Sequence, residues 1–320
     1  MKILITGAGG FVGQFLANEL LQSPSNRLVL TDIVDVARPK CSLHSENAII
    51  IKADLLTESS KVVRHDLDAV FILHGIMSSG AEANFDQGFQ VNFDATRNLL
   101  DCIRKAKPRI RVIYASSIAV YGRPFADKIT EDVFPTPEGS YGCAKLMCET
   151  LINEYTRRGY VDGFVVRLPG ITVRPGQPAQ AASSFLSGII REPLARKRCL
   201  VPTTDRSKSF WICSPHILVK NLIHLLSLPN HALPIHKRAL NLPGSLVSIQ
   251  QMRNALARVG GDDKLNYIDE AENTGFDELV QSWPCNFDVS LALKLGLYPA
   301  ESFEKAVEDY LQHSENNGST

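Results

Sequence analysis

The 320-residue chain lacks the features that mark membrane, secreted and nucleic-acid-binding proteins. Neither charge is in excess, since 34 basic residues balance 34 acidic ones, so a dominant nucleic-acid or acidic-membrane surface is not expected. No uncharged apolar stretch approaches the roughly 20 residues that span a bilayer. The first residues enter an apolar run without a signal-peptide pattern. We therefore expect a cytoplasmic protein that is long enough to bury a large core.

Cysteine and histidine are present, but without the spacing of a metal site. The seven cysteines are odd in number and include no Cys-x-x-Cys pair, which indicates reduced thiols rather than a disulfide framework or a zinc site. The eight histidines do not gather at ligand spacing, and no metal is predicted. Five of them are expected at the surface or the edge of the core: His65, His216, His224, His231 and His236.

Through its first half the chain alternates short apolar runs with helical patterns. The runs are rich in Val, Ile and Leu and lack strict alternation, which is typical of parallel strands buried on both faces. Strands are expected at Lys2–Thr6, Arg27–Asp32, Ala48–Ala53, Ala69–His74, Arg111–Ala115 and Gly163–Leu168. Helices are expected near residues 11–22, 57–66, 85–106 and 142–158. This succession predicts an α/β fold with a doubly wound parallel sheet.

A glycine-rich turn joins the first expected strand to the first helix. Gly7, Gly10 and Gly13 have the spacing Gly-x-x-Gly-x-x-Gly, which differs from the standard Gly-x-Gly-x-x-Gly. Glycine allows a tight turn and a close backbone approach to a pyrophosphate, and the helix that begins with Phe11 and Val12 offers free N–H groups. The turn predicts a dinucleotide site, and a glycine-rich turn without a ligand is the alternative.

Two carboxylates follow the next strands. Asp32 ends the second strand, where it can bind both ribose hydroxyls and repel a 2′-phosphate, so NAD is favoured over NADP. Its alternative role is to cap a loop. Asp54 and Leu55 follow the third strand, where they can flank the adenine or stabilise a turn.

Two fragments later in the same half-chain carry the chemistry. Tyr141 and Lys145 are four residues apart, so on a helix they share one face. A free phenol titrates near pH ~10, and an adjacent ammonium is expected to lower that pKa. Ser117, at a strand end, could then hold the substrate oxygen while Tyr141 moves its proton. For the neighbouring Ser116 we expect a hydrogen bond to the backbone.

Together these residues resemble the extended short-chain dehydrogenases/reductases, the superfamily that includes sugar-nucleotide epimerases and dehydratases. The motifs, in order, are Gly7-x-x-Gly10-x-x-Gly13, Asp54-Leu55, Val91-Asn92-x-x-x-Thr96, Ser117 and Tyr141-x-x-x-Lys145. A narrower likeness is to D-erythronate dehydrogenase-type members, which are NAD-dependent enzymes that oxidise small polyhydroxy acids. It rests on residues 116–125, 167–176, 187–194 and 283–288.

The resemblance implies a Rossmann-type sheet, NAD as cofactor, and a role for each matching residue. Tyr141 would be the general acid/base, Lys145 its partner and a contact of the nicotinamide ribose, and Ser117 would bond the reacting oxygen. Further cofactor contacts would come from His74, Gly75, Asn92, Pro169 and Ile171. The resemblance also implies a homodimer that pairs through the helices around Thr96–Lys105 and Lys145–Tyr155.

The candidates for substrate contacts are two serines and one arginine. Ser78 and Ser79 follow the fourth strand and can reach polyol hydroxyls or hold a turn. Arg174 can clamp a carboxylate through two hydrogen bonds or form a surface ion pair. Arg123 and Arg191 are expected in solvent.

After Leu168 the pattern changes and prolines become frequent. Helices are expected near residues 215–228, 249–259 and 302–312, and a short strand at Ala239–Leu242. We expect residues 1–168 to form the NAD-binding domain and residues 169–313 a smaller substrate-binding lobe. The two would be partly interwoven, because residues 215–242 could return to the main sheet. Residues 314–320 would form a flexible tail.

The leading hypothesis is hydride transfer between NAD and a secondary alcohol or ketone carbon of a small polyhydroxy acid, or of a related small carbonyl compound. Phe210 and Ile212 are apolar where the likeness would place polar residues, and this predicts a more apolar pocket. A nucleotide-sugar epimerase or dehydratase is the first alternative, although residues 167–175 lack the asparagine and aromatics common in that class. A non-catalytic NAD sensor is the second, and the intact Ser117, Tyr141 and Lys145 argue against it.

Overall fold

A doubly wound parallel sheet forms the first lobe of the protein. The computed structural model describes residues 1–40, 42–176 and 182–316, and over these residues the sheet has seven strands in the order β10-β6-β5-β4-β1-β2-β3. The strands are β1 (Lys2–Thr6), β2 (Arg27–Asp32), β3 (Ala48–Lys52), β4 (Ala69–Ile72), β5 (Ile110–Ser117), β6 (Val161–Leu168) and β10 (Ala239–Asn241). The predicted fold is confirmed. Strand order reverses between β1 and β4, and such a switch point opens a crevice at the carboxyl ends of the strands.

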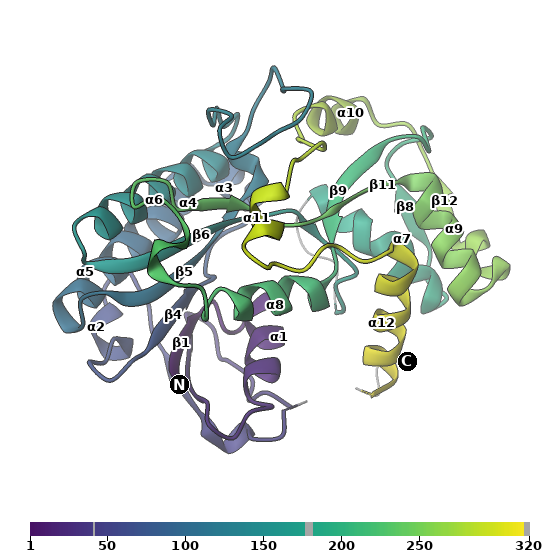
Figure 1. Cartoon of the computed structure of the whole chain (residues 1–320). Coiled ribbons are helices and arrows are strands. Elements are labelled where there is room, and N and C mark those ends of the chain that lie inside the picture. The colour runs from purple at the N-terminus through teal and green to yellow at the C-terminus, as the bar shows by residue number, and fades with distance from the viewer. Residues whose placement is uncertain (41, 177–181, 317–320) are drawn as a thin grey trace.

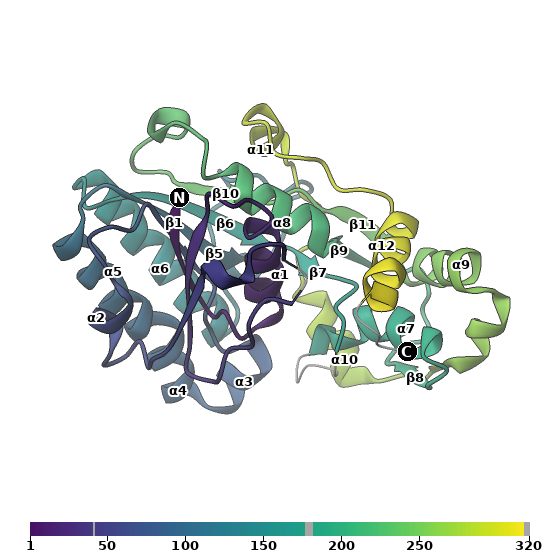
Figure 2. The same ribbon diagram turned by 90° about the horizontal axis from the view of Figure 1, so that it is seen from below.

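Helices cover both faces of this sheet. On one face α1 (Phe11–Leu20) lies beside α8 (Pro215–His224), as Figure 2 shows from below. On the other face lie α5 (Ala95–Ala106) and α6 (Ser140–Arg157). The helix expected near residues 57–66 is only one turn, α2 (Ser59–Val62), because Val63 is extended. The helix expected at 85–106 is α4 (Phe85–Phe89) joined to α5 by a π-helical segment, Gln90–Asp94.

The second lobe lies beside the first in Figure 1 and has small sheets of its own. Strands β7 (Gly170–Ile171), β9 (Ser209–Cys213) and β11 (Ser245–Ser248) form one, and β8 (Cys199–Val201) pairs with β12 (Ile268–Glu270). The surrounding helices are α7 (Phe185–Leu194), α9 (Ile249–Gly260), α10 (Thr274–Gln281) and α12 (Phe303–Asn316). Helix α12 extends into the segment predicted as a flexible tail, and residues 317–320 lie outside the described chain.

Phe210 and Ile212 belong to the core of this second lobe. Both are 3% exposed, and the Phe210 ring meets Phe185 and Trp283 edge to face. Because alternate residues of a strand face opposite sides, β9 directs these two side chains into the lobe rather than toward a substrate. The prediction of a more apolar pocket from these residues is therefore wrong.

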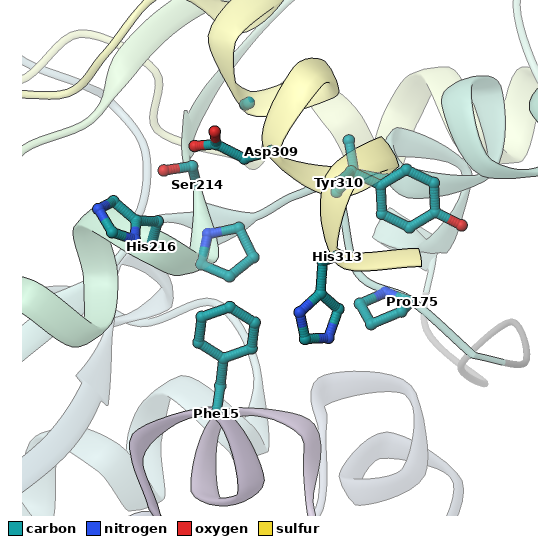
Figure 3. A pocket seen from close by; sticks show the side chains of 10 residues that line it. Phe15, Pro175, Ser214, His216, Asp309, Tyr310 and His313 are labelled. Atoms are coloured by element: carbon teal, nitrogen blue, oxygen red, sulfur yellow. The ribbon is translucent and has the colours of Figure 1, made fainter. Parts of the chain in front are cut away.

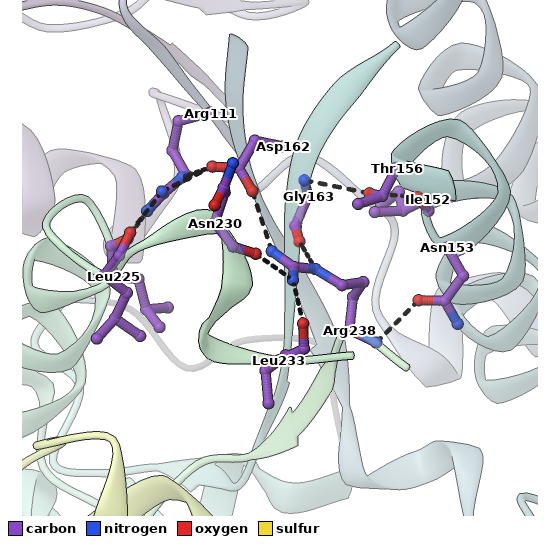
Figure 4. Close-up of polar contacts among 11 residues, drawn as sticks. Arg111, Ile152, Asn153, Thr156, Asp162, Gly163, Leu225, Asn230, Leu233 and Arg238 are labelled. Carbon is purple, nitrogen blue, oxygen red and sulfur yellow. Dashed lines mark hydrogen bonds and ion pairs between the residues drawn. The ribbon is translucent and has the colours of Figure 1, made fainter. Parts of the chain in front are cut away.

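The chain returns from the second lobe to the first, and a buried arginine fastens the return (Figure 4). Strand β10 pairs with β6, and Arg238 just before it is 1% exposed. Its guanidinium bonds Asp162 at 3.0 Å, and Arg111 bonds the same carboxylate at 2.7 Å. Arg238 also donates to the carbonyl oxygens of Gly163, Asn230 and Leu233. The segment after α8 is thereby tied to the amino end of β6.

Two further expectations concern membranes and metals. Within the described ranges, no helix combines the length and apolarity needed to cross a bilayer. In the same residues no three His, Cys, Asp or Glu side chains converge as a metal site would require. Six described cysteines are free thiols, and Cys41 lies outside the described residues.

Candidate active site

The glycine turn after β1 is too tight for side chains. Gly7 has φ +67°, and a Cβ added to it would lie 2.6 Å from the backbone nitrogen of His74. A Cβ on Gly13 would lie 2.4 Å from the Gly7 carbonyl oxygen. Helix α1 starts directly after the turn with Gly10 as its N-cap and no capping side chain. A bare, close-fitting turn at a helix N-terminus suits a pyrophosphate.

Asp32 lies beside this turn at the end of β2. Its carboxylate accepts hydrogen bonds from the backbone N–H groups of Gly9, at 3.0 Å, and Ile33, at 2.7 Å. It caps the loop in this structure and borders the turn where a ribose would lie. Asp54 holds a turn by accepting from the N–H of Leu56 at 2.9 Å, and Leu55 is buried.

At the switch point, His74 is held between two threonines. Its Nδ1 lies 2.8 Å from the Thr6 hydroxyl and its Nε2 lies 3.2 Å from the Thr96 hydroxyl. Burial, and then the charge of Lys145, lowers the pKa of His74 to about 3, so the ring is neutral. Asn92 lies in the π-helical segment, and its amide bonds both the N–H and the carbonyl of Ile76. Such segments are frequent at functional sites.

Helix α6 brings Tyr141 and Lys145 to the carboxyl end of β5, and Ser117 ends that strand. Lys145 is 3% exposed, and its ammonium donates to the carbonyl of Ala115 at 2.8 Å. The same nitrogen lies 5.6 Å from the centre of the Tyr141 ring. The Ser117 hydroxyl accepts from the N–H of Ala119 at 3.1 Å, and its interaction with Tyr141 acts to lower the pKa of that phenol. The structure thus brings all three predicted catalytic residues together.

Burial dominates the acid–base properties of this centre. It raises the pKa of Tyr141 to about 12, while the hydrogen bond with Ser117 and the charge of Arg174 act in the opposite direction. It lowers the pKa of Lys145 to about 8, against the influence of Cys148 and Glu149. The expectation that Lys145 brings the pKa of Tyr141 below its usual value is wrong. The Lys145 ammonium bonds the strand carbonyl, and desolvation of the phenolate outweighs the nearby charges.

Arg174 lies near Tyr141, and each affects the pKa of the other. Burial, and then the charge of Arg191, lowers the pKa of Arg174, whereas Tyr141 acts to raise it. The described residues offer its guanidinium no carboxylate at ion-pair distance. The alternative of a surface ion pair is therefore not realised here.

Helix α7 holds the backbone of Arg174. The N–H of Arg174 donates to the Ser187 hydroxyl at 3.0 Å, and Arg191 donates to the Arg174 carbonyl at 2.9 Å. Arg191 is 7% exposed and pairs with Glu192, so the expectation of a solvated Arg191 is wrong. Arg123 is about half exposed and pairs with Glu138.

The other predicted substrate and cofactor residues lie around the same edge of the sheet. Ser78 and Ser79 are exposed and begin helix α3 (Ser78–Ala83), so they stand in a helical turn rather than a loop. Pro169 is buried directly after β6, and Ile171 is buried in β7.

Two glutamates near the centre were not predicted from the sequence. Glu82 accepts hydrogen bonds from both the N–H and the hydroxyl of Ser140 at 2.6 Å. It thereby gives a free backbone N–H of α6 a partner and places a negative charge at the positive end of the helix dipole. Glu149 accepts from the Ser116 hydroxyl, where a backbone partner was expected. The spacing Lys145-x-x-x-Glu149 could have indicated a shared helix face, whereas nothing in the sequence links Glu82 to a helix 58 residues away.

A separate pocket lies between α1, the start of α8 and α12 (Figure 3). Phe15, Pro175, His216 and His313 are among its lining residues, and none of the predicted catalytic residues is. Because Val173 and Pro175 line it, this pocket borders the loop that carries Arg174 without being the catalytic centre.

Comparison with known proteins agrees with the fold. D-erythronate dehydrogenase from Haemophilus influenzae is 38% identical over 316 residues, covering 98% of this chain and 99% of the relative. D-erythronate dehydrogenase from Cupriavidus necator is 36% identical and covers 98% of each chain. The solved structure of a nucleoside-diphosphate-sugar epimerase from Agrobacterium tumefaciens has a TM-score of 0.90 at 32% identity, covering 100% of this chain and 95% of that one. The model of the NAD dependent epimerase/dehydratase family matches residues 3–212. The chain therefore belongs to the NAD-dependent epimerase/dehydratase family.

Proposed function

We propose that this protein is an NAD-dependent dehydrogenase that oxidises a secondary alcohol carbon of a small polyhydroxy acid, or reduces the corresponding ketone. The observation that carries the proposal is the guanidinium of Arg174, which lies beside the Tyr141 phenol and has no carboxylate partner among the described residues. The phenol can exchange a proton with an alcohol, and the guanidinium can hold a carboxylate through two parallel hydrogen bonds. The near full-length relatives named D-erythronate dehydrogenase support an acid of this kind.

For NAD we propose a site along the edge where β1, β2 and β4 end. The pyrophosphate would lie against Gly7, Gly10 and Gly13 and the start of α1 with Phe11 and Val12, since this cradle admits no Cβ at Gly7 or Gly13. Asp32 would exchange its loop hydrogen bonds for the ribose hydroxyls. Further contacts are proposed from Asp54, Leu55, His74, Gly75, Asn92, Tyr141, Lys145, Pro169 and Ile171. In this proposal residues 1–168 with α8 and β10 form the NAD-binding domain, and the rest of residues 169–313 forms the substrate-binding lobe, which also lends Pro169 and Ile171 to the NAD site.

The catalytic step follows from the positions of three side chains. Bound NAD supplies the hydride acceptor and, when oxidised, a positive charge. As the carbon–hydrogen bond breaks, Tyr141 takes the hydroxyl proton of the substrate, and in reduction it returns that proton. Ser117 holds the reacting oxygen, and Lys145 stabilises the phenolate that the step requires. Positive charge near Tyr141 favours this step, because burial holds the pKa of the phenol at about 12 even though Ser117 and Arg174 act to lower it.

For the substrate we propose Arg174 at the carboxylate and Ser117 with Tyr141 at the reacting carbon. Ser78 and Ser79, exposed at the start of α3, are proposed for the remaining hydroxyls. Helix α3 contacts the first turn of α6 through the Ser140 hydroxyl and the Ala81 carbonyl, at 3.4 Å, which keeps these serines near the catalytic helix.

A nucleotide-sugar epimerase is the second candidate, favoured by the solved epimerase at 32% identity. Such an enzyme uses NAD transiently and regenerates it. The two candidates separate on the fate of the cofactor, because only a dehydrogenase accumulates NADH with its substrate.

We further propose a homodimer in the cytoplasm. The subunits would pair through the predicted helices α5 and α6, where Met147 on α6 is 37% exposed, and Phe85 on the neighbouring α4 is 61% exposed. Four helices from two subunits could bury them together. The six free thiols among the described cysteines fit a reducing compartment.

The decisive experiment is an NAD-reduction screen over aldonates, uronates, polyols and hydroxy acids, repeated with Tyr141→Phe. We expect NADH production with a short-chain acid and its loss in the variant, with NAD binding retained. The matched control is Tyr155→Phe on the same helix, whose hydroxyl bonds Asp101 at 2.7 Å, away from the centre. Turnover by Tyr141→Phe at the wild-type rate would overturn the assignment.

A further inference from the structure

Helix α6 meets the end of β5 through three side chains, each one turn further along the helix. The three contacts are Tyr141 with Ser117, Lys145 with the Ala115 carbonyl, and Glu149 with the Ser116 hydroxyl. Residues four apart lie on one helix face. Three consecutive strand residues are therefore each tied to one turn of the helix. The first two contacts form the catalytic centre, and the third lies directly behind it.

Glu149 is itself held in a fixed position. Arg167 on β6 binds its carboxylate with two nitrogens, Nε at 3.0 Å and Nη2 at 2.6 Å. The two side chains are 3% and 5% exposed. Arg167 also donates to the Tyr121 hydroxyl, which bonds the Asn241 side chain at 2.9 Å. This two-pronged geometry fixes the direction as well as the distance of the carboxylate.

We propose that Glu149 is a positioning residue for the reaction, which sets the register of α6 against β5 and keeps Lys145 in its ammonium form. The register decides how far the Tyr141 phenol lies from the Ser117 hydroxyl, and misplacement of reacting groups by about 1 Å can cost a hundredfold in rate. The expected effect on the reaction rate rests on the proposed dehydrogenase function, whereas the expected effect on the charge of Lys145 does not.

Among the titratable groups that face Lys145, Glu149 is the one that supplies a negative charge. The titratable side chains that face it are His74 after β4, Tyr114 on β5, and Tyr141, Cys148 and Glu149 on α6. His74 is neutral, and burial raises the pKa of the Cys148 thiol. Glu149 is the one carboxylate in this set, and it acts against the burial that lowers the pKa of Lys145.

The test compares Glu149→Gln with Asp162→Asn, the same change at the buried pair near the other end of β6. For Glu149→Gln we expect kcat to fall about tenfold with the KM for NAD within about twofold. We also expect the alkaline limb of the pH–rate profile to move about one unit lower, because Lys145 loses its proton more easily. Asp162→Asn should keep the wild-type kcat and profile. If Glu149→Gln keeps them too and loses only thermal stability, its role is structural and the proposal is overturned.

A second readout does not depend on turnover. Lysines labelled with 13C at Cε are titrated by NMR, with the Lys145 signal assigned by its absence in Lys145→Met. The pKa of Lys145 should fall in Glu149→Gln and stay unchanged in Asp162→Asn, and an unchanged value in both overturns the charge effect. If the wild-type protein turns over no substrate, the dehydrogenase function fails while this titration still decides the charge of Lys145.

Should Glu149→Gln not fold, Ser116→Ala retains the ion pair between Glu149 and Arg167 and tests the register of α6 against β5. We expect a several-fold loss of kcat without a pH shift, and a wild-type kcat overturns the positioning role.

Discussion

Strand β6 has an arginine–carboxylate pair near each of its ends, fully buried at the carboxyl end and largely buried at the amino end, and the surroundings of the two pairs differ. Near the carboxyl end Arg167 pairs with Glu149, one helical turn behind Lys145. Near the amino end Asp162 pairs with Arg238 and Arg111 in a network that contains no predicted site residue (Figure 4). Because burying charges costs free energy, we expect each pair to have a structural or functional role. The amino-end pair fastens the returning chain, and the carboxyl-end pair holds the catalytic helix.

The two ends of β6 also differ in the partners of the charged groups around them. At the amino end the two guanidiniums share one carboxylate and donate to backbone carbonyls, and that carboxylate acts against the burial that lowers the pKa of Arg238. Next to the carboxyl-end pair, on α6 and after β4, burial shifts the pKa values of Tyr141, Lys145 and His74 to about 12, 8 and 3, each against the charged form. Such shifts are typical of functional sites. Substitutions at the carboxyl end should therefore change activity, and those at the amino end stability.

The largest effect is expected for Lys145→Met. Turnover should fall by about a thousandfold, since general acid–base catalysis typically contributes 10²–10⁴-fold. Thermal stability should change little, because a buried ammonium with one carbonyl partner is expensive to hold. The measurements are kcat/KM and the melting temperature. A large drop in melting temperature with activity retained would place Lys145 with the structural network instead.

The opposite pattern is expected for Arg238→Met. Unfolding free energy should fall by about 2–4 kcal/mol, because several buried carbonyls and Asp162 lose a donor. Activity should not change at temperatures where the variant is folded. Urea unfolding gives the first quantity and steady-state kinetics the second, with Arg97→Met on the exposed side of α5 as the control. A reduced kcat would show that the amino end of β6 also supports the site.

The two ends also differ in what the sequence could predict. The glycine turn, Ser117, Tyr141 and Lys145 depend on local spacing, and each lies where its motif requires, at the carboxyl ends of buried strands. The contacts of Glu82, Glu149 and Arg238 join partners that are 58, 33 and 76 residues away in the sequence. The burial of Phe210 and Ile212 in the core of the second lobe also depends on tertiary packing. Burial also reversed the expected pKa shift of Tyr141, because desolvation is set by tertiary packing.

An intermediate effect is expected for Arg174→Gln. The KM for the acid substrate should rise about ten- to thirtyfold, which corresponds to the roughly 1.5–2 kcal/mol of hydrogen bonds to a charged group. Turnover of a neutral polyol, where measurable, should not change, because the lost partner is a carboxylate. Arg123→Gln, in an exposed pair with Glu138, is the control. Equal losses on acid and neutral substrates would show that Arg174 acts through folding or through NAD.

The smallest effect concerns pH and His74. Its pKa is about 3 in the folded protein and near 6.5 when unfolded, so below pH 6.5 the unfolded state binds a proton that the folded state does not. Stability from this group is therefore complete above pH 6.5 and is lost as the pH falls toward 3. In His74→Gln, which can still bond Thr6 and Thr96, the difference in unfolding free energy between pH 7 and pH 5.5 should shrink by about 1 kcal/mol. Urea unfolding at both pH values measures it, and Arg238→Met should keep the wild-type difference. If His74→Gln and Arg238→Met show the same difference as the wild type, the acid sensitivity of the protein does not lie at His74.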